Sequence, residues 1–155
     1  MYRWLAITLA LHGRMVPSMV LSMLCVLFLF LPKFTFGDSA WWSCLLYHFS
    51  HANIFHLVLN LWALFQFRPR WKTCLVAYMS ASVAALLPFV SLSIPTCGLS
   101  GLLMAAYARK YAESKLPIWK PIAANMAFVF IPTFNWKIHL VSFLLSYLVW
   151  RLKRK

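Results

Sequence analysis

Residues 16–35 read VPSMVLSMLCVLFLFLPKFT, an apolar stretch in which Lys33 is the one charged side chain. Coiled as a helix that rises ~1.5 Å per residue, a stretch of this length matches the roughly 30 Å hydrocarbon core of a bilayer. Further apolar runs follow, separated by short segments that carry basic residues and prolines. Lipid does not tolerate unpaired backbone groups, so we expect each run to be helical. The sequence therefore predicts an all-α, polytopic membrane protein.

Composition favours a membrane environment over a soluble one. Of the 155 residues, 63% are hydrophobic and 11% are charged, and the mean hydropathy is +0.76. A soluble domain of this size could not bury so much apolar surface. The formal net charge of +13 would suit nucleic acid, but the basic residues lie between the apolar runs and at the chain ends. Anionic lipid is the expected partner of basic residues in those places, and we expect no nucleic acid.

A single domain, residues 1–155, accommodates six predicted spans at about 16–35, 46–67, 73–93, 98–112, 118–134 and 137–151. Residues 1–14 are interpreted as an amphipathic cytoplasmic lead-in, because the apolar stretch Leu5–Leu11 is short for a signal peptide and Arg14 interrupts it. With the N-terminus inside, only Lys33 and Lys137 of the 15 Lys and Arg residues fall on the outer side. The positive-inside rule thus predicts an N-in, C-in protein, as in a bacterial inner membrane.

Polar residues are rare in these spans, and they gather in the outer halves of the second, fourth and sixth. Counted from the basic anchors at ~1.5 Å per residue, Ser100 lies about 14 Å and His139 about 18 Å above the inner interface. On the same scale Asn60 lies about 12 Å up and His56 about 18 Å. Gly98–Arg109 covers only about 17 Å, so the loop before it must dip into the membrane. We expect these residues to meet in a buried, wet cavity.

Serine and histidine at matching depth indicate nucleophilic catalysis. A serine hydroxyl is a weak nucleophile until a base accepts its proton, and histidine is the usual base. We therefore assign Ser100 as the nucleophile and His139 as the base. The two acidic residues, Asp38 and Glu113, lie in loops, so a dyad is expected in place of a triad. Taken singly, these residues also have a structural explanation, as hydrogen bonds within or between membrane helices.

Neighbouring residues complete the predicted site. Gly98 and Gly101 allow close approach of a substrate and leave the backbone N–H of the serine between them available to an oxyanion. His56 and Asn60 share one helix face and could donate to the same oxyanion. His51 lies about half a turn from Asn60 on the helical wheel and is assigned to loop packing.

In order and spacing these residues resemble the rhomboid family of intramembrane serine proteases, across roughly residues 15 to 151. The residues that carry the resemblance are His51-x4-His56-x3-Asn60, Gly98-x-Ser100-Gly101 and His139. The resemblance implies a six-helix bundle, a Ser-His dyad, an oxyanion site and no cofactor. It also implies cleavage of single-span membrane proteins that enter near the fifth helix, where Pro117, Pro121 and Pro132 suit a loosely packed gate.

The chain departs from the family pattern at several positions. Trp42 is followed by Ser43 where the family often has Trp-Arg, and Ser142 and Ser146 replace two glycines after the catalytic histidine. Both serines are small, so close packing against Gly101 remains possible. At Met104 many members carry an aromatic residue that stacks on the histidine. These differences, in a short chain, leave room for a specialised subfamily such as rhombosortases.

Two other functions remain open at this point. One is a rhomboid-like protein that binds transmembrane helices without cutting them, although such relatives typically lack the serine or the histidine. The other is a small transporter or channel subunit, although no predicted span carries a carboxylate.

The cysteines and histidines suggest no metal centre. The histidines lack a carboxylate or thiolate partner at ligand spacing, so we expect neither metal nor cofactor. Cys44 and Cys97 both fall on the predicted outer side, where an oxidising compartment could join them, but the sequence does not fix their distance.

Overall fold

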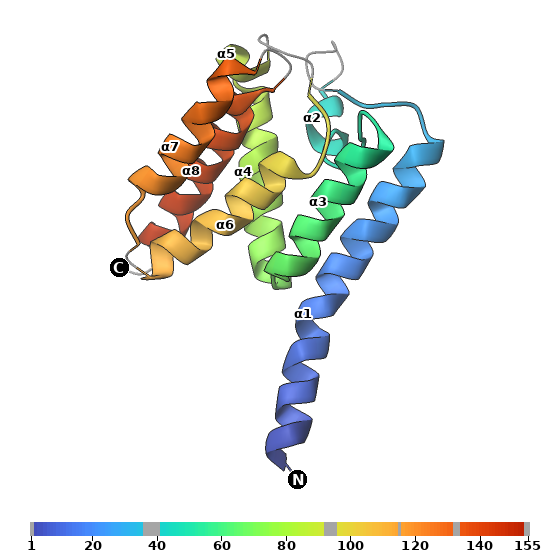
Figure 1. The fold of residues 1–155 in the computed structure, drawn as a ribbon, viewed down its shortest axis with the longest axis vertical. Coiled ribbons are helices and arrows are strands. Elements are labelled where there is room, and N and C mark those ends of the chain that lie inside the picture. The colour runs from blue at the N-terminus through green and yellow to red at the C-terminus, as the bar shows by residue number, and fades with distance from the viewer. Residues whose placement is uncertain (1, 36–40, 92–95, 115, 132–133, 154–155) are drawn as a thin grey trace.

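The computed structural model describes residues 2–35, 41–91, 96–114, 116–131 and 134–153, and only the backbone of residues 2–12, 14 and 91. Within these ranges every regular element is a helix, which confirms the all-α prediction (Figure 1). The elements in chain order are α1 (Tyr2–Leu27), the 3-10 helix η1 (Phe28–Phe30), α2 (Ser43–Leu46), α3 (Ile54–Phe67), α4 (Trp71–Leu86), α5 (Pro88–Ser91), α6 (Ser100–Ser114), α7 (Trp119–Met126), the 3-10 helix η2 (Ala127–Phe130) and α8 (Trp136–Leu152).

The first helix differs from the predicted span 16–35 at both ends. α1 begins at Tyr2, so the segment interpreted as a separate lead-in is the first half of this helix. Neither Gly13 nor Arg14 ends it, because a single glycine or charge weakens a helix without breaking it. The helix gives way to η1 after Leu27, and Leu31 is extended (φ −106°, ψ 161°). Leu31 precedes Pro32, and proline disfavours the helical conformation in the residue before it.

The predicted spans 46–67 and 118–134 are also interrupted. Residues 47–53 are not helical, and α3 starts only where the Asn53 side chain accepts the backbone N–H of His56 at 2.9 Å. In the later span α7 ends at Met126, η2 follows, and Ile131 is extended (φ −100°, ψ 107°) immediately before Pro132. Among the described residues, no helix combines the length and the apolar character needed to cross a membrane.

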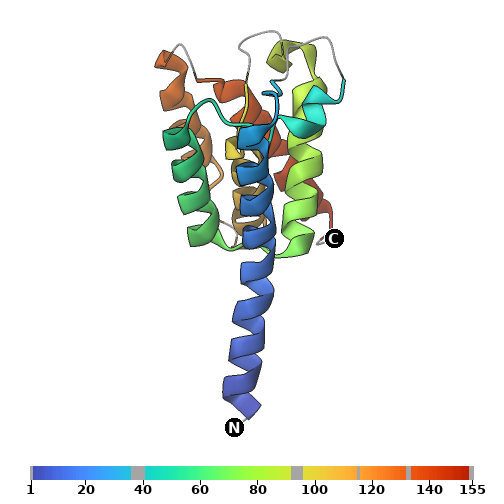
Figure 2. The same ribbon diagram turned by 90° about the vertical axis from the view of Figure 1, so that its right-hand side faces the viewer.

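Three helices, α4, α6 and α8, pack against one another and form the centre of the bundle. α1 and α3 lie on one side of this centre and α7 on the other (Figure 1). Figure 2 shows α3 and α7 on the same face of the bundle, with α4 and α8 on the opposite face. The two ends of the chain and the α3–α4 turn lie toward the same end of the bundle (Figure 1).

The interior combines small and polar residues with a set of buried Leu, Ile, Phe, Tyr and Trp side chains, whereas many other large apolar residues face outward. Alanines of α4 and α6 are fully buried, and Ser142 and Ser146 of α8 are buried beside them. Exposed apolar side chains recur about one helical turn apart, as Met19, Met23 and Leu27 on α1, Phe55, Leu59 and Trp62 on α3, and Trp71, Leu75 and Met79 on α4. Small residues let helix backbones approach closely, so this pattern explains the tight packing of the centre.

Candidate active site

α6 begins inside the bundle, well below the upper end of α4 in Figure 1. The chain descends to it through residues 96–99, as Figure 1 shows. Gly98 donates its backbone N–H to the Tyr47 carbonyl at 2.8 Å and has φ +111°. A positive φ of this size favours glycine, and α6 begins two residues later, at Ser100. The glycine therefore turns the descending chain into the helix that carries the serine.

Ser100 and His139 are in direct contact. Their Oγ and Nε2 atoms lie 2.7 Å apart, so α6 and α8 present the two side chains to each other at hydrogen-bonding distance. His139 is buried, with 3% of its surface exposed, while Ser100 is half-buried. Within the described part of the chain, the second ring nitrogen of His139, Nδ1, has no hydrogen-bond partner. Glu113, expected in a loop, lies in the last turn of α6, where it pairs with Arg109, and Asp38 lies outside the described residues.

His56 and Asn60 lie beside the turn that precedes Ser100. A Cβ placed on Gly98 would come within 2.6 Å of His56 Cε1 and 3.4 Å of Asn60 Nδ2. Asn60 donates one amide hydrogen to the His56 carbonyl at 3.0 Å, which fixes its side chain along α3 and leaves its second hydrogen for another acceptor. The two residues assigned to the oxyanion thus border the same turn as the serine.

His51 and Gly101 have packing roles. His51 Nδ1 lies 3.1 Å from the Phe49 carbonyl, and its ring packs against that of His56 with centroids 5.2 Å apart. It thus lies in the loop and also supports His56. A Cβ on Gly101 would lie 3.4 Å from Ile138 Cγ1 and 3.7 Å from Ser142 Oγ. Close packing at Ser142 is therefore retained although the family pattern has glycine there.

Two cavities meet at the Ser100–His139 pair. The larger, of about 510 Å³, extends from the pair between α3, α6 and α7, and its lining includes Asn60, Met104, Tyr107, Pro121, Asn125 and Phe128. The smaller, of about 310 Å³, is lined by His56, Asn53, Thr96, Cys97 and Asn135. Ser100, His139 and Phe134 line both cavities. A molecule in either space would reach the serine hydroxyl.

Phe134 packs against the His139 ring in a tilted arrangement, a contact that no sequence pattern predicted. The two ring centroids lie 4.4 Å apart at an interplanar angle of 34°, and Phe128 stacks in turn on Phe134 at 4.4 Å and 29°. Met104, at the position where the family pattern has an aromatic residue, lines the larger cavity and packs against the buried cluster of Ala108, Tyr111 and Phe143. The sequence signal for this contact was that Phe134 lies shortly before His139. In a chain with 13 phenylalanines such a placement does not by itself predict a ring contact.

Asn125 is a second residue that sequence reasoning missed. It is buried on α7, and its amide donates to the Trp136 carbonyl at 2.8 Å. This bond joins α7 to the first turn of α8, the helix that carries His139. A polar residue in a predicted apolar span was the signal that could have identified it.

Cys97 lines the smaller cavity beside Ser100. All four cysteines are free, so Cys44 and Cys97 are not joined in the structure. Burial raises the pKa of the Cys97 thiol, with Lys33 opposing that shift in part. A raised pKa keeps the thiol protonated near neutral pH, and the protonated form is a poor nucleophile. Among the described residues, no group of His, Cys, Asp or Glu side chains is arranged to hold a metal ion.

No protein-family model matches this chain, and no curated protein matches it either.

Proposed function

We propose that this protein is a rhomboid-type intramembrane serine protease that hydrolyses a peptide bond of single-span membrane-protein substrates with a Ser100–His139 dyad. The observation that carries the proposal is the 2.7 Å contact between Ser100 Oγ and His139 Nε2 where two cavities meet. A nucleophile within hydrogen-bonding reach of a base and open to a ligand-sized space is what acyl transfer requires.

The catalytic steps follow from the placement of the groups. Ser100 Oγ attacks the scissile carbonyl while its proton passes to His139 Nε2, which later delivers that proton to the leaving amine. The tetrahedral oxyanion would be held by the Ser100 backbone N–H and by the donors of His56 and Asn60 that border Gly98. Water then hydrolyses the acyl-enzyme with the same base.

A membrane environment is supported by the distribution of residue types in the bundle. Serines and asparagines are buried with the alanines in the interior, whereas the exposed side chains of α1, α3 and α4 include many large apolar ones. In water such stripes would form exposed patches that soluble monomers rarely carry. In lipid the same stripes would be the solvated surface, and the small interior residues would permit close helix packing.

Substrate entry between α3 and α7 is supported by the larger cavity, which lies between these helices. α7 is only eight residues long, and the Asn125 bond to Trp136 ties it to α8. A substrate helix would unwind here and present an extended segment to Ser100.

Fluorophosphonate labelling of the purified protein in detergent tests the nucleophile. We expect covalent label on the wild type and none on Ser100→Ala, because the probe reacts with serines that an adjacent base activates. Ser146→Ala is the matched control: it removes a buried hydroxyl that has no hydrogen-bond partner in the described structure, and it should label like the wild type. Label retained on Ser100→Ala would contradict the assignment. A folded wild type that resists two different probes would favour a helix-binding protein without catalysis.

Replacing Phe134 should slow the reaction without abolishing it. Stacked aromatic pairs contribute roughly 0.5–1.5 kcal/mol, so Phe134→Ala should lower the labelling rate up to about tenfold by loosening the His139 ring. Phe134→Tyr keeps a stacking ring and should retain most of the rate. The measurement is the labelling rate against pH. A loss shared equally by the Ala and Tyr variants would contradict a role in positioning His139.

A further inference from the structure

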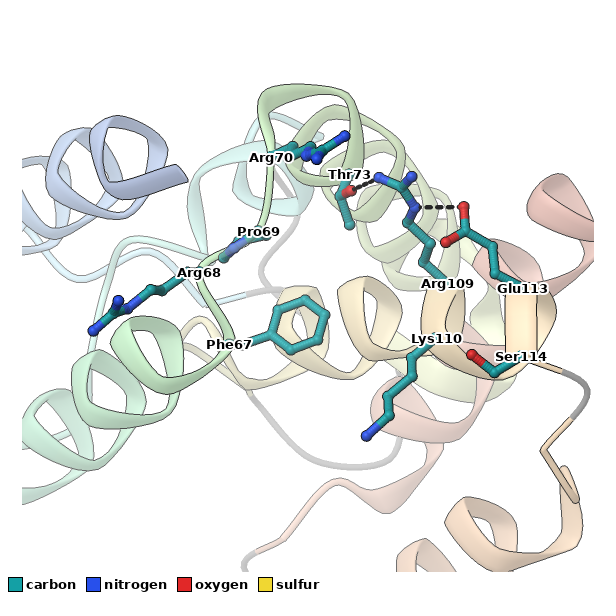
Figure 3. A pocket seen from close by; sticks show the side chains of 9 residues that line it. All are labelled: Phe67, Arg68, Pro69, Arg70, Thr73, Arg109, Lys110, Glu113 and Ser114. Carbon is teal, nitrogen blue, oxygen red and sulfur yellow. Dashed lines mark hydrogen bonds and ion pairs between the residues drawn. The ribbon is translucent and has the colours of Figure 1, made fainter. Parts of the chain in front are cut away.

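A separate pocket lies at the other end of α6, beside the α3–α4 turn. Its volume is about 430 Å³, and its lining residues are Phe67, Arg68, Pro69, Arg70, Thr73, Arg109, Lys110, Glu113 and Ser114 (Figure 3). Four of these side chains are cationic and one is acidic. Neither Ser100 nor His139 lines this pocket, and the proposed proteolysis does not use it.

Arg109 is held rigidly in this pocket. Its Nε donates to Glu113 Oε1 at 2.7 Å and its Nη1 to Thr73 Oγ1 at 2.7 Å. The guanidinium carbon also lies 4.5 Å from the centre of the Trp150 ring. The two hydrogen bonds engage Nε and Nη1 of its three nitrogens. A guanidinium already fixed in place loses little conformational entropy when it binds an anion.

Arg70 and the N-terminus of α4 add positive charge beside Arg109. In Figure 3 the Arg70 side chain lies on the side of the pocket where Thr73 and Arg109 meet, whereas Arg68 points away from them. Arg68 Nε instead donates to the Phe65 carbonyl at 3.0 Å. Arg70 is also the N-cap residue of α4, whose first turn receives no side-chain cap. The positive end of the α4 dipole therefore adds to the charges of Arg70 and Arg109.

We propose that this pocket binds a phosphate group, with Arg70 and Arg109 as its principal ligands. A guanidinium offers paired N–H donors that match phosphate oxygens. With the Glu113 carboxylate subtracted, the two guanidiniums and the helix N-terminus leave a net charge of roughly +1.5 for a phosphate to balance. Phe67 supplies an apolar wall, and the exposed Trp71 ring follows directly on Arg70. The phosphate can belong to an anionic lipid headgroup or to a soluble phosphoester.

Native mass spectrometry of the full chain in detergent tests this proposal. We expect phosphatidylglycerol to bind roughly tenfold more tightly than zwitterionic phosphatidylcholine, and the Arg70→Gln, Arg109→Gln double variant to lose about tenfold in affinity for phosphatidylglycerol. Arg70→Gln alone leaves the Arg109 contacts intact and should lose about threefold. The matched control is Arg151→Gln, an exposed cation on α8 outside the pocket, which should change the affinity less than about twofold.

Competition distinguishes the two sources of phosphate. Displacement of the lipid by millimolar inorganic phosphate or glycerol phosphate would identify a site for soluble phosphoesters. Retention of the lipid would identify a headgroup site that also uses the acyl chains. The proposal would be overturned by an equal loss in Arg151→Gln, or by unchanged binding in a double variant whose thermal unfolding matches the wild type. Binding is measured without any cleavage, so failure here is distinguishable from failure of the protease proposal.

Discussion

Replacing His139 with alanine is expected to slow fluorophosphonate labelling of Ser100 by about 10²- to 10⁴-fold, the range that a general base contributes. The ring nitrogen Nε2 lies 2.7 Å from Ser100 Oγ, and among the described residues no carboxylate lines either cavity beside the pair. Removing the ring therefore takes away the nitrogen that lies within hydrogen-bonding reach of the hydroxyl, and His56 is the imidazole that still lines the smaller cavity. The labelling rate in excess probe measures the loss directly.

A second variant separates lost chemistry from lost packing. His139 is buried, so alanine also opens a cavity in α8. His139→Gln fills most of that volume and can still hydrogen-bond to Ser100, but an amide does not accept a proton near neutral pH. It should be folded and as slow as His139→Ala. A glutamine variant that keeps the wild-type rate would show that His139 is not the base.

The pH profile should change in the same variant. Only the neutral imidazole can accept the serine proton, so the wild-type rate should rise with pH until the ring is fully deprotonated. In His139→Gln this rise should disappear, because the imidazole that contacts the hydroxyl is gone. Persistence of the rise would indicate another base.

The site was more predictable from sequence than the helix boundaries were. Counting residues from the basic anchors placed Ser100, His139, His56 and Asn60 within about one or two helical turns of one another in height, because a helix converts residue number into distance. The structure brings Ser100 and His139 into contact and sets His56 and Asn60 beside Gly98. The helical fold was predicted from the apolar runs, because in lipid few structures other than a helix can pair every backbone N–H and C=O group.

What the sequence could not predict depends on packing between segments. Phe134 reaches His139 because the chain before α8 leaves η2 in an extended conformation, and no local pattern records that path. The start of α1 at Tyr2 was missed because hydropathy reports where a helix would meet lipid, while helix continuation depends on backbone hydrogen bonds. The cluster around Arg109 needed the α4 register to be known, since Thr73 is 36 residues away in the chain.

Replacing Gly98 with alanine should lower both the free energy of unfolding and the rate of fluorophosphonate labelling. The backbone at this position has φ +111°, where an L side chain is strained by about 1–3 kcal/mol. The added Cβ would also lie 2.6 Å from Cε1 and 2.9 Å from Nε2 of His56, so the His56 ring or the turn itself must move. Either movement displaces the serine N–H or the oxyanion donors. We expect at least about a 10²-fold lower labelling rate, the loss typical of a missing oxyanion donor.

Gly101→Ala is the matched control for this change. The two glycines flank the same serine, but a Cβ on Gly101 would meet nothing closer than 3.4 Å, at Ile138 Cγ1 and the Tyr47 hydroxyl. Its helical backbone accepts alanine, so stability should change little and most of the labelling rate should remain. Thermal unfolding and labelling rate of both variants form the measurement. If Gly98→Ala unfolds and labels like Gly101→Ala, the turn before Ser100 does not require glycine, and His56 does not lie against it in solution.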